Sequence, residues 1–297
     1  MSISKAAVVV ATCGRPDVVG LLMEDLNKQT RLPCQVILSV VSEEDVPERN
    51  DRQIDYELII GQKGTCIQRN AGIDGLREDV EVVLFLDDDY VPSRHAVENV
   101  CATFARYPEV VGVEGSVLAD GVTRGGYSYE DSRRIVDDYD ASQDSVQSSL
   151  PITTGLQGLY GCNMAFRTAA IGATRFDLAL PLYGWQEDVD FSYRVGKQGQ
   201  LAKAKAFTGV HRGVTGGRSP GVRLGYSQVA NPFYLSRKGT MNSKAAYTLI
   251  LRNMLANHVR VFRPEAWIDR KGRVKGNWIA LIDALKGRLS PMNITSL

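Results

Sequence analysis

The first part of the chain alternates short apolar runs with segments whose apolar residues recur at helical spacing. The runs are continuous and rich in β-branched residues, as in strands buried on both faces of a sheet. They predict four strands, over residues 6–12, 35–41, 56–61 and 81–86. A helix opened by Pro16 follows the first run, and another is predicted over residues 67–78. The alternation predicts an α/β fold with a mainly parallel central sheet flanked by helices.

The pattern changes twice further along the chain. Residues 120–150 are polar with few apolar anchors and predict a long loop, a kind of segment that is often functional or disordered. From Lys244 onward the spacing predicts a helical C-terminal extension. Its apolar residues form one stripe, with Arg252, His258 and Arg260 off it; the stripe consists of Leu251, Leu255, Val259 and Phe262.

Composition narrows the class of protein. The 297 residues carry a net charge of +1, with 44% hydrophobic and 23% charged residues, which argues against disorder and against a generally basic nucleic-acid binder. No apolar run approaches the roughly 20 residues that span a bilayer, and the N-terminal run is too short for a signal peptide. Five scattered cysteines without a CxxC pair are typical of reduced thiols, so we expect a cytoplasmic protein.

Charge is unevenly distributed along the chain. Residues 231–297 hold twelve Lys or Arg residues and three acids, a net charge of +9, which leaves −8 on the remainder. Basic residues beside apolar stripes are typical of helices that lie on an anionic membrane. An amphipathic helix that packs on its own domain, or on a second subunit, has the same pattern. The sequence therefore leaves three partners open for this region: an anionic membrane, the rest of its own domain, or a second subunit.

The acidic triplet Asp87, Asp88 and Asp89 follows the fourth predicted strand directly. Adjacent carboxylates repel one another unless a cation lies nearby, and the carboxyl ends of strands are where open α/β sheets bind ligands. Along an extended chain, Asp87 and Asp89 point to one side and Asp88 to the other. The triplet predicts a Mg²⁺ or Mn²⁺ site. The alternative is a solvated turn that caps the next helix.

Two other segments carry candidate chemistry. Lys63, Arg69 and Asn70 surround the start of a helix whose small residues allow close approach, so they could contact a diphosphate or a base. Glu187 and Asp188 lie beside Trp185, and a carboxylate in a partly apolar pocket is a plausible general base. The alternatives are an exposed basic helix start and an acid-rich helix N-terminus.

Five motifs together resemble a known family. In chain order they are TCGRPD, GTCIQRNAGI, LFLDDDY, GCNMAFR and WQEDVDFSYR. This set is similar to inverting glycosyltransferases of family 2, which have the GT-A fold, and the resemblance covers roughly residues 6–217. It implies a Rossmann-like sheet, a sugar-nucleotide donor and a manganese or magnesium ion that bridges the diphosphate.

The resemblance also implies roles for single residues. Asp89 would hold the metal, Asp87 would reach the metal or the ribose, and Asp88 would take the variable middle place of the DxD motif. Asp188 would deprotonate the acceptor hydroxyl, and Glu187 would help to place the acceptor. Other positions match contacts to the nucleotide or the metal; these are Thr12, Arg15, Arg69 and His211.

One segment departs from the family pattern. Many relatives carry an Asp after the second strand that reads uracil, but here Glu43, Glu44 and Asp45 are displaced from that position. A UDP-sugar is the favoured donor, and this departure leaves GDP- and dTDP-sugars open. The Gly-rich segment 212–223 could close over the diphosphate through Arg212, Arg218 or Arg223, or be an ordinary surface loop.

These inferences predict a GT-A catalytic domain over residues 1–230, followed by a basic helical region over 231–297. Within the domain, residues 1–119 would bind the nucleotide-sugar and residues 120–230 the acceptor. The expected function is transfer of a sugar to a glycan or lipid-linked acceptor in bacterial polysaccharide biosynthesis, in the cytoplasm or at the inner membrane face. The alternatives are a metal-dependent nucleotidyltransferase and a non-catalytic sugar-nucleotide-binding protein; a homo-oligomer also stays open.

Overall fold

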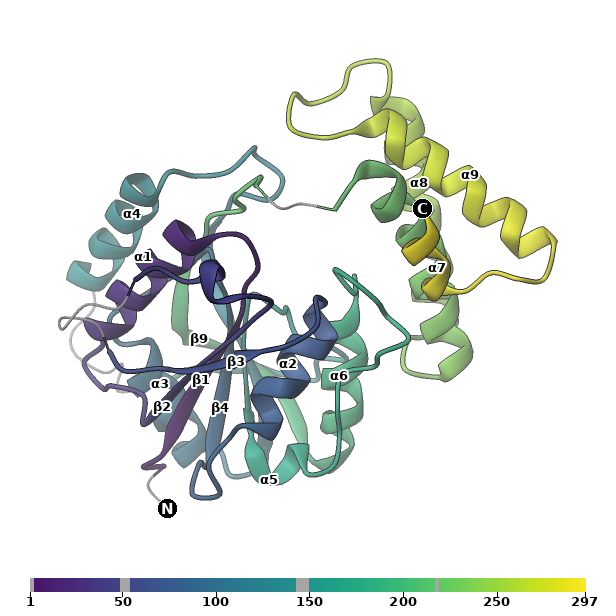
Figure 1. The fold of residues 1–297 in the computed structure, drawn as a ribbon. Coiled ribbons are helices and arrows are strands. Elements are labelled where there is room, and N and C mark those ends of the chain that lie inside the picture. Colours follow the sequence, from purple (N-terminus) through teal and green to yellow (C-terminus); the bar gives the residue numbers. More distant parts are fainter. Residues whose placement is uncertain (1–2, 49–53, 143–149, 217–218) are drawn as a thin grey trace. The chain divides into compact units, whose positions relative to one another are not determined.

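The computed structural model describes residues 3–48, 54–142, 150–216 and 219–297 (Figure 1). The chain divides into two compact units. The first consists of Met1–Lys63, Ile67–Arg175 and Ser192–Gly217. The second consists of Gly64–Cys66, Phe176–Phe191 and Arg218–Leu297. The sequence predicts a boundary at residue 230 between a catalytic domain and a basic region. That boundary is defined by function and not by compactness, so it stays a prediction.

The first unit is built on a mixed nine-stranded sheet in the order β3-β2-β1-β4-β8-β6-β9-β5, with β7 paired to β9. The sheet has helices on both sides (Figure 1). Its strands are β1 (Ala6–Ala11), β2 (Gln35–Val40), β3 (Glu57–Ile60), β4 (Val82–Asp87), β5 (Tyr90–Pro92), β6 (Val110–Asp120), β7 (Ile152–Thr154), β8 (Asn163–Arg167) and β9 (Gln200–His211).

Strands β1 to β4 are parallel, as the sequence predicts, with β1 between β2 and β4. The β1 and β4 side chains are almost completely buried, which explains their continuous apolar runs. Beyond β4 the sheet becomes mixed, because β8 pairs antiparallel with both β4 and β6. The α/β class with a central sheet and flanking helices is confirmed.

Two helices of the first half cover opposite faces of β1. Helix α1 (Pro16–Asn27) packs its buried residues into one core with Val8 and Val10, and α3 (Ala96–Arg106) joins the same core. Helix α2 (Thr65–Asp74) lies on the other face, where a Cβ on Gly72 would come within 2.3 Å of Val9 Cγ1. Gly72 thus permits close packing of α2 on the sheet, whereas the sequence suggested close approach to a ligand.

The expectation of a long loop over residues 120–150 is wrong for half of that segment. Residues Tyr129–Ser142 form helix α4, and residues 143–149 lie outside the described residues. The buried side of the helix combines apolar Val136, which packs with Val91 and Val210, with polar Ser132 and Asp140. Asp140 accepts hydrogen bonds from the Ser93 hydroxyl at 2.5 Å and from the Arg94 backbone N–H at 3.0 Å. Arg133 pairs with the fully buried Asp25 at 3.3 Å.

The second unit is mainly helical, as predicted for the C-terminal extension. It contains α7 (Gly221–Lys238), α8 (Ser243–Arg260), α9 (Arg270–Leu285) and the 3₁₀ helix η3 (Pro291–Ser296), with α7 packed against the other three. It also holds the first turn of α6 (Glu187–Val195). The remaining short helices are η1 (Glu43–Asp45), α5 (Thr168–Ile171) and η2 (Gly196–Gln198). Within the described part of the chain, no helix is both long enough and apolar enough to cross a membrane.

Candidate metal and donor site

The acidic triplet lies at the carboxyl end of β4, where the chain turns into β5. Asp87 is the last residue of β4, and Asp88 and Asp89 form the turn. Asp88 accepts a hydrogen bond from the Thr12 hydroxyl at 2.7 Å and pairs with Arg15 at 3.2 Å. Burial raises the pKa of Asp88 to about 7, although the Arg15 guanidinium opposes this shift. Asp88 thus contacts the end of β1 through Thr12, and the same Arg15 nitrogen also lies 3.9 Å from Asp89 Oδ2, so the predicted alternation of the triplet stays a prediction.

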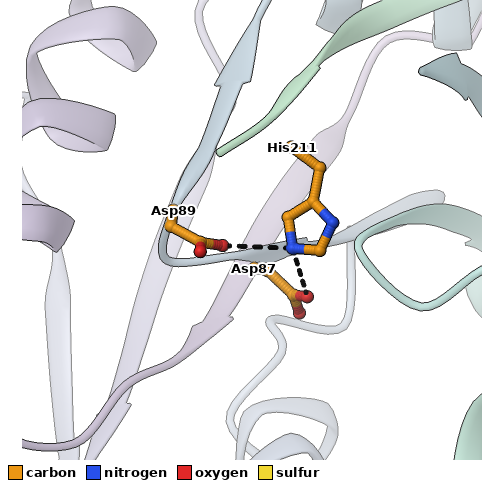
Figure 2. A group of neighbouring side chains, drawn as sticks. All are labelled: Asp87, Asp89 and His211. Atoms are coloured by element: carbon orange, nitrogen blue, oxygen red, sulfur yellow. Dashed lines mark ion pairs between the residues drawn. The ribbon is translucent and has the colours of Figure 1, made fainter. Parts of the chain in front are cut away.

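Asp87 and Asp89 converge on His211. The His211 Nε2 atom lies 3.3 Å from Asp89 Oδ1 and 3.7 Å from Asp87 Oδ2 (Figure 2). One ligand atom from each of the three residues lies within 4.8 Å of the other two. Strand pairing produces this arrangement, since β5 pairs with β9 so that His211 stands opposite Tyr90, the residue after Asp89.

The other ring nitrogen of His211 is held by an acid. Its Nδ1 lies 3.3 Å from Asp120 Oδ1 and 3.1 Å from the Tyr160 hydroxyl, which donates to Asp120 Oδ2 at 2.9 Å. Burial lowers the pKa of His211, but the hydrogen bonds to Asp120 and Asp89 outweigh it and raise that pKa to about 10. A carboxylate on Nδ1 leaves Nε2 to face Asp87 and Asp89, an arrangement that metal-binding histidines commonly use.

The three side chains fit a divalent cation. Two carboxylate oxygens and one imidazole nitrogen suit Mn²⁺, whereas Mg²⁺ would be held by the carboxylates; either ion takes further oxygens from water or phosphate. Two further contacts hold the carboxylates in place. Arg69 donates to Asp87 Oδ1 at 2.9 Å, and the Val214 backbone N–H donates to Asp89 Oδ2 at 2.7 Å. Asp120 orients His211 as described. The remaining oxygens, Asp87 Oδ2 and Asp89 Oδ1, are those that face Nε2.

Two guanidinium groups of the first unit have buried Nε atoms without a hydrogen-bond partner among the described residues, those of Arg15 and Arg212. An unpaired buried donor is costly, and an anionic ligand would satisfy it. Arg15 is held beside the triplet by its loop, in which Gly14 donates its backbone N–H to the buried Asp45 at 2.6 Å. Arg212 directly follows the histidine of the candidate metal group. The chemistry of both donors fits a phosphate.

The other residues predicted to bind the donor have different surroundings. Arg69 is buried on α2 and donates to the Gly161 carbonyl at 2.9 Å as well as to Asp87, so its visible role is to orient the candidate metal ligand. Lys63 is exposed in the loop before α2, and Asn70 is partly exposed on that helix. Their assignment to the donor stays a prediction.

Glu187 and Asp188 form the start of α6, in the second unit. The preceding loop carries two non-glycine residues in left-handed backbone conformations, Leu182 with φ of 58° and Gln186 with φ of 75°. Such strain persists only where the surroundings hold the chain firmly. Here the Leu182 carbonyl accepts from the Thr65 backbone N–H at 2.8 Å, and the Trp185 carbonyl accepts from Asn231 on α7 at 2.8 Å. The role of Asp188 as general base stays a prediction.

The first turn of α6 is also fixed by a buried ion cluster. Asp190 is fully buried and accepts hydrogen bonds from Thr240 at 2.8 Å and Lys238 at 2.9 Å. The same Lys238 ammonium donates to Asp177 at 2.5 Å, and the Tyr234 hydroxyl donates to Asp177 at 2.8 Å. Helix α7 thereby holds the backbone that carries Glu187 and Asp188.

Comparison with solved structures identifies the fold, although no family model and no curated protein sequence matches the chain. A crystal structure of S. aureus TarS residues 1–349 matches with a TM-score of 0.52 at 12% identity, covering 95% of this chain and 83% of that one. The chain has a GT-A-like fold. A longer S. aureus TarS structure matches with a TM-score of 0.49 at 14% identity, over 77% of this chain. The chain spans only 40% of that longer structure.

Several residues that shape the site in this GT-A-like fold escaped the sequence analysis. Asp120 and Tyr160 orient His211, but nothing in their local sequence indicates this, because they reach it through the pairing of β6 with β9 and through the loop before β8. Gln68 donates to the Thr12 carbonyl at 2.8 Å and to the Ser39 carbonyl at 2.7 Å, joining the ends of β1 and β2. Asp45 was noted only as a departure from the family pattern.

The predicted lid over residues 212–223 can be located in part. Arg212 follows β9 beside the candidate metal group, and Arg218 lies outside the described residues. Arg223 belongs to α7, where its Nε donates to the Leu297 carbonyl at 2.8 Å. The visible contact of Arg223 therefore anchors the C-terminus, and the joint action of the three arginines stays a prediction.

Proposed function

We propose that this protein is a metal-dependent inverting glycosyltransferase that moves a sugar from a nucleoside diphosphate to an acceptor hydroxyl. The observation that carries the proposal is the convergence of Asp87, Asp89 and His211 at the carboxyl end of β4, in a GT-A-like fold. Ligands bind at such strand ends in open α/β sheets. The fold shared with TarS is a glycosyltransferase fold, which supports this reaction class.

Each group has a distinct part in the proposed reaction. When bound, the cation would neutralise the negative charge of the diphosphate leaving group. Arg15 and Arg212 would donate their unpaired Nε–H groups to phosphate oxygens. Asp188 would accept the proton of the acceptor hydroxyl as its oxygen bonds to the anomeric carbon and the bond from that carbon to the diphosphate oxygen breaks. A single displacement of this kind inverts the anomeric configuration.

The donor base and the acceptor belong to the same proposal. We favour a UDP-sugar, and GDP- and dTDP-sugars stay in the test because the acids after β2 are displaced from the position where many relatives read uracil. In this structure Asp45 is used internally, since it accepts backbone N–H groups of Gly14, Val41 and Ser42. We further propose that the acceptor is a glycan or a lipid-linked glycan of bacterial polysaccharide biosynthesis.

A binding experiment tests the candidate metal site without needing the acceptor. The full chain is mixed with Mn²⁺ and a panel of UDP-, GDP-, dTDP- and CMP-sugars, and its thermal unfolding temperature is measured. We expect one donor class to raise that temperature only when Mn²⁺ is present, since ligands that bind the folded state stabilise it. Asp89→Asn should abolish the rise. The control Asp79→Asn, which removes an acid exposed at the surface, should retain it.

A second experiment separates transfer from binding. With the donor identified, its slow hydrolysis and transfer to acceptor fragments are measured in Asp188→Asn. We expect the metal-dependent thermal shift to persist and turnover to fall by about 10²–10⁴-fold, as for loss of a general base. Release of a nucleoside diphosphate supports glycosyl transfer, whereas release of a sugar 1-phosphate would support nucleotidyl transfer. A donor that binds but never turns over, with any acceptor tried, would favour a binding protein.

A further inference from the structure

Helices α8 and α9 expose an unusual amount of apolar side chain. On α8 and just after it, large apolar residues recur every three or four positions, and their exposed fractions run from 55% for Tyr247 to 86% for Phe262. A second stripe on α9 begins at Trp278, 53% exposed, and ends at Leu285, 89% exposed. We call these residues the α8–α9 apolar face: Tyr247, Leu251, Leu255, Val259, Phe262, Trp278, Ile282 and Leu285.

The two stripes meet at one aromatic contact. The Trp278 ring of α9 lies edge-on to the His258 ring of α8, with 5.9 Å between their centroids, so the start of the α9 stripe lies beside the last turn of α8. The two helices contact each other in the second unit, where both are labelled in Figure 1. The opposite side of α8 is buried against the unit through Ala246, Ile250 and Asn257. The packing of this unit is therefore complete without the α8–α9 apolar face.

Positive charge surrounds this face. Exposed lysines and an arginine lie in or beside the two stripes: Lys244, Arg252, Lys271, Lys275 and Lys286. The three acids of residues 231–297 are all engaged elsewhere. Glu265 pairs with Arg260 at 2.9 Å and with Arg270 at 2.8 Å, and Asp269 caps α9 through the Gly272 N–H. Asp283 is buried and pairs with Arg288 at 2.7 Å.

We propose that the α8–α9 apolar face binds the surface of an anionic lipid bilayer, with both helices lying in the plane of the interface. Helices with an apolar stripe and flanking Lys and Arg residues bind such surfaces, and each basic residue adds attraction to anionic headgroups. Tyr247 and Trp278 are the ring types that favour the boundary between headgroups and acyl chains. A second copy of the chain would bring the same positive rim against itself, which is unfavourable.

Vesicle sedimentation tests the proposal independently of metal, donor and turnover. The full chain is centrifuged with vesicles of phosphatidylglycerol and phosphatidylcholine, and with vesicles of phosphatidylcholine alone, at low and high salt. We expect binding to the anionic vesicles at low salt, and a loss at high salt because salt screens the charges. The double variant Leu251→Gln/Leu255→Gln should lower the partition coefficient about tenfold or more, because less apolar surface is buried.

Matched variants make the result specific. Leu32→Gln/Leu178→Gln removes two leucines that are 55% and 57% exposed but lie outside the face, so it should bind vesicles as the wild type does. The triple variant Arg252→Gln/Lys271→Gln/Lys275→Gln should lower binding on the order of a hundredfold, since each cation contributes separately. Thermal unfolding of each variant checks that the fold is intact.

Three results would overturn the proposal. The first is the absence of pelleting with anionic vesicles at low salt. The second is binding that the double leucine variant retains in full. The third is a dimer that forms in a concentration-dependent way in analytical ultracentrifugation, is dissociated by Leu251→Gln/Leu255→Gln, and is accompanied by no vesicle binding. The face would then be an interface between two copies.

Discussion

The two units of the molecule each contain a cluster of aspartates, and the clusters differ in how their oxygens are satisfied. In the second unit, Asp177 and Asp190 share the Lys238 ammonium and accept further hydrogen bonds from Tyr234 and Thr240. In the first unit, Asp87 Oδ2 and Asp89 Oδ1 both face the single nitrogen Nε2 of His211. One cluster is held by an ammonium group of the protein, and the other, with a histidine nitrogen between its two oxygens, could hold a metal ion.

This difference teaches how an acidic cluster can be interpreted. Acidic residues alone do not distinguish structural from functional chemistry, because both clusters consist of aspartates with basic partners. The hydrogen-bond donors around the carboxylates distinguish the two kinds of cluster. Where hydroxyl and ammonium groups donate to the carboxylate oxygens, the cluster holds helices together. Where two oxygens and an oriented imidazole converge, the cluster can bind a metal. The predictions below test whether substitutions in the second-unit cluster lower stability and substitutions in the first-unit cluster lower ligand binding.

The largest expected effect is on stability and comes from Lys238→Met. The change leaves Asp177 and the fully buried Asp190 without their shared cation, and an uncompensated buried charge is strongly destabilising. We expect the free energy of unfolding to fall by about 3 kcal/mol, the lower end of the range for broken buried pairs, because a quarter of the Lys238 side chain is exposed. Urea denaturation measures it.

Lys5→Met is the matched control, because it breaks an ion pair with Asp79 whose side chains are 46% and 55% exposed. Its expected cost is below about 1 kcal/mol. Asp89→Asn in the other cluster should abolish the Mn²⁺-dependent thermal shift. If Lys238→Met unfolds at the same urea concentration as Lys5→Met, the second cluster is not a structural clamp and the contrast between the two clusters fails.

The next effect concerns metal affinity and comes from Asp120→Asn. The Asn retains a hydrogen-bonding shape but removes the negative charge that orients His211 through Nδ1. Loss of such a partner weakens metal binding about 10–100-fold. Titration of the full chain with Mn²⁺, followed by calorimetry or electron paramagnetic resonance, measures the affinity. The exposed acid Asp131 gives the control Asp131→Asn. Equal affinities in the two variants would show that Asp120 does not support the candidate metal ligand.

The first four strands and the helices α1 and α2 could be predicted because local patterns determine them. Each parallel strand is a continuous apolar run, and the predicted ends lie within one residue of those observed. Strands β5 to β9 could not be arranged from the sequence, because their order depends on a mixture of parallel and antiparallel pairing between segments far apart in the chain. Helix α4 was missed because its buried positions are mostly polar: Val136 is apolar, but Ser132 and Asp140 lie at the same spacing, and contacts to Asp25, Ser93 and Arg94 help to hold it.

The candidate site was predictable to a similar extent. The acidic triplet was recognisable because it follows a buried strand directly, and His211 because it matched a family position. The buried state of Arg69, its bond to Asp87 and the support of His211 by Asp120 needed the three-dimensional structure. The apolar stripe on α8 was expected from its spacing. That it faces outward depends on which side of the helix packs on α7, and spacing alone does not determine this.

The smallest effect tests a single hydrogen bond within the structural cluster. Tyr234→Phe removes the hydroxyl that donates to Asp177 at 2.8 Å and keeps the ring near the Lys238 ammonium, 5.8 Å from its centroid. We expect a loss of about 0.5–1.5 kcal/mol in the free energy of unfolding, as for one hydrogen bond. In the double variant with Lys238→Met the two losses should not add, since both groups bind Asp177. Strict additivity in urea denaturation would mean that Asp177 does not couple them, and that Lys238 acts through Asp190 alone.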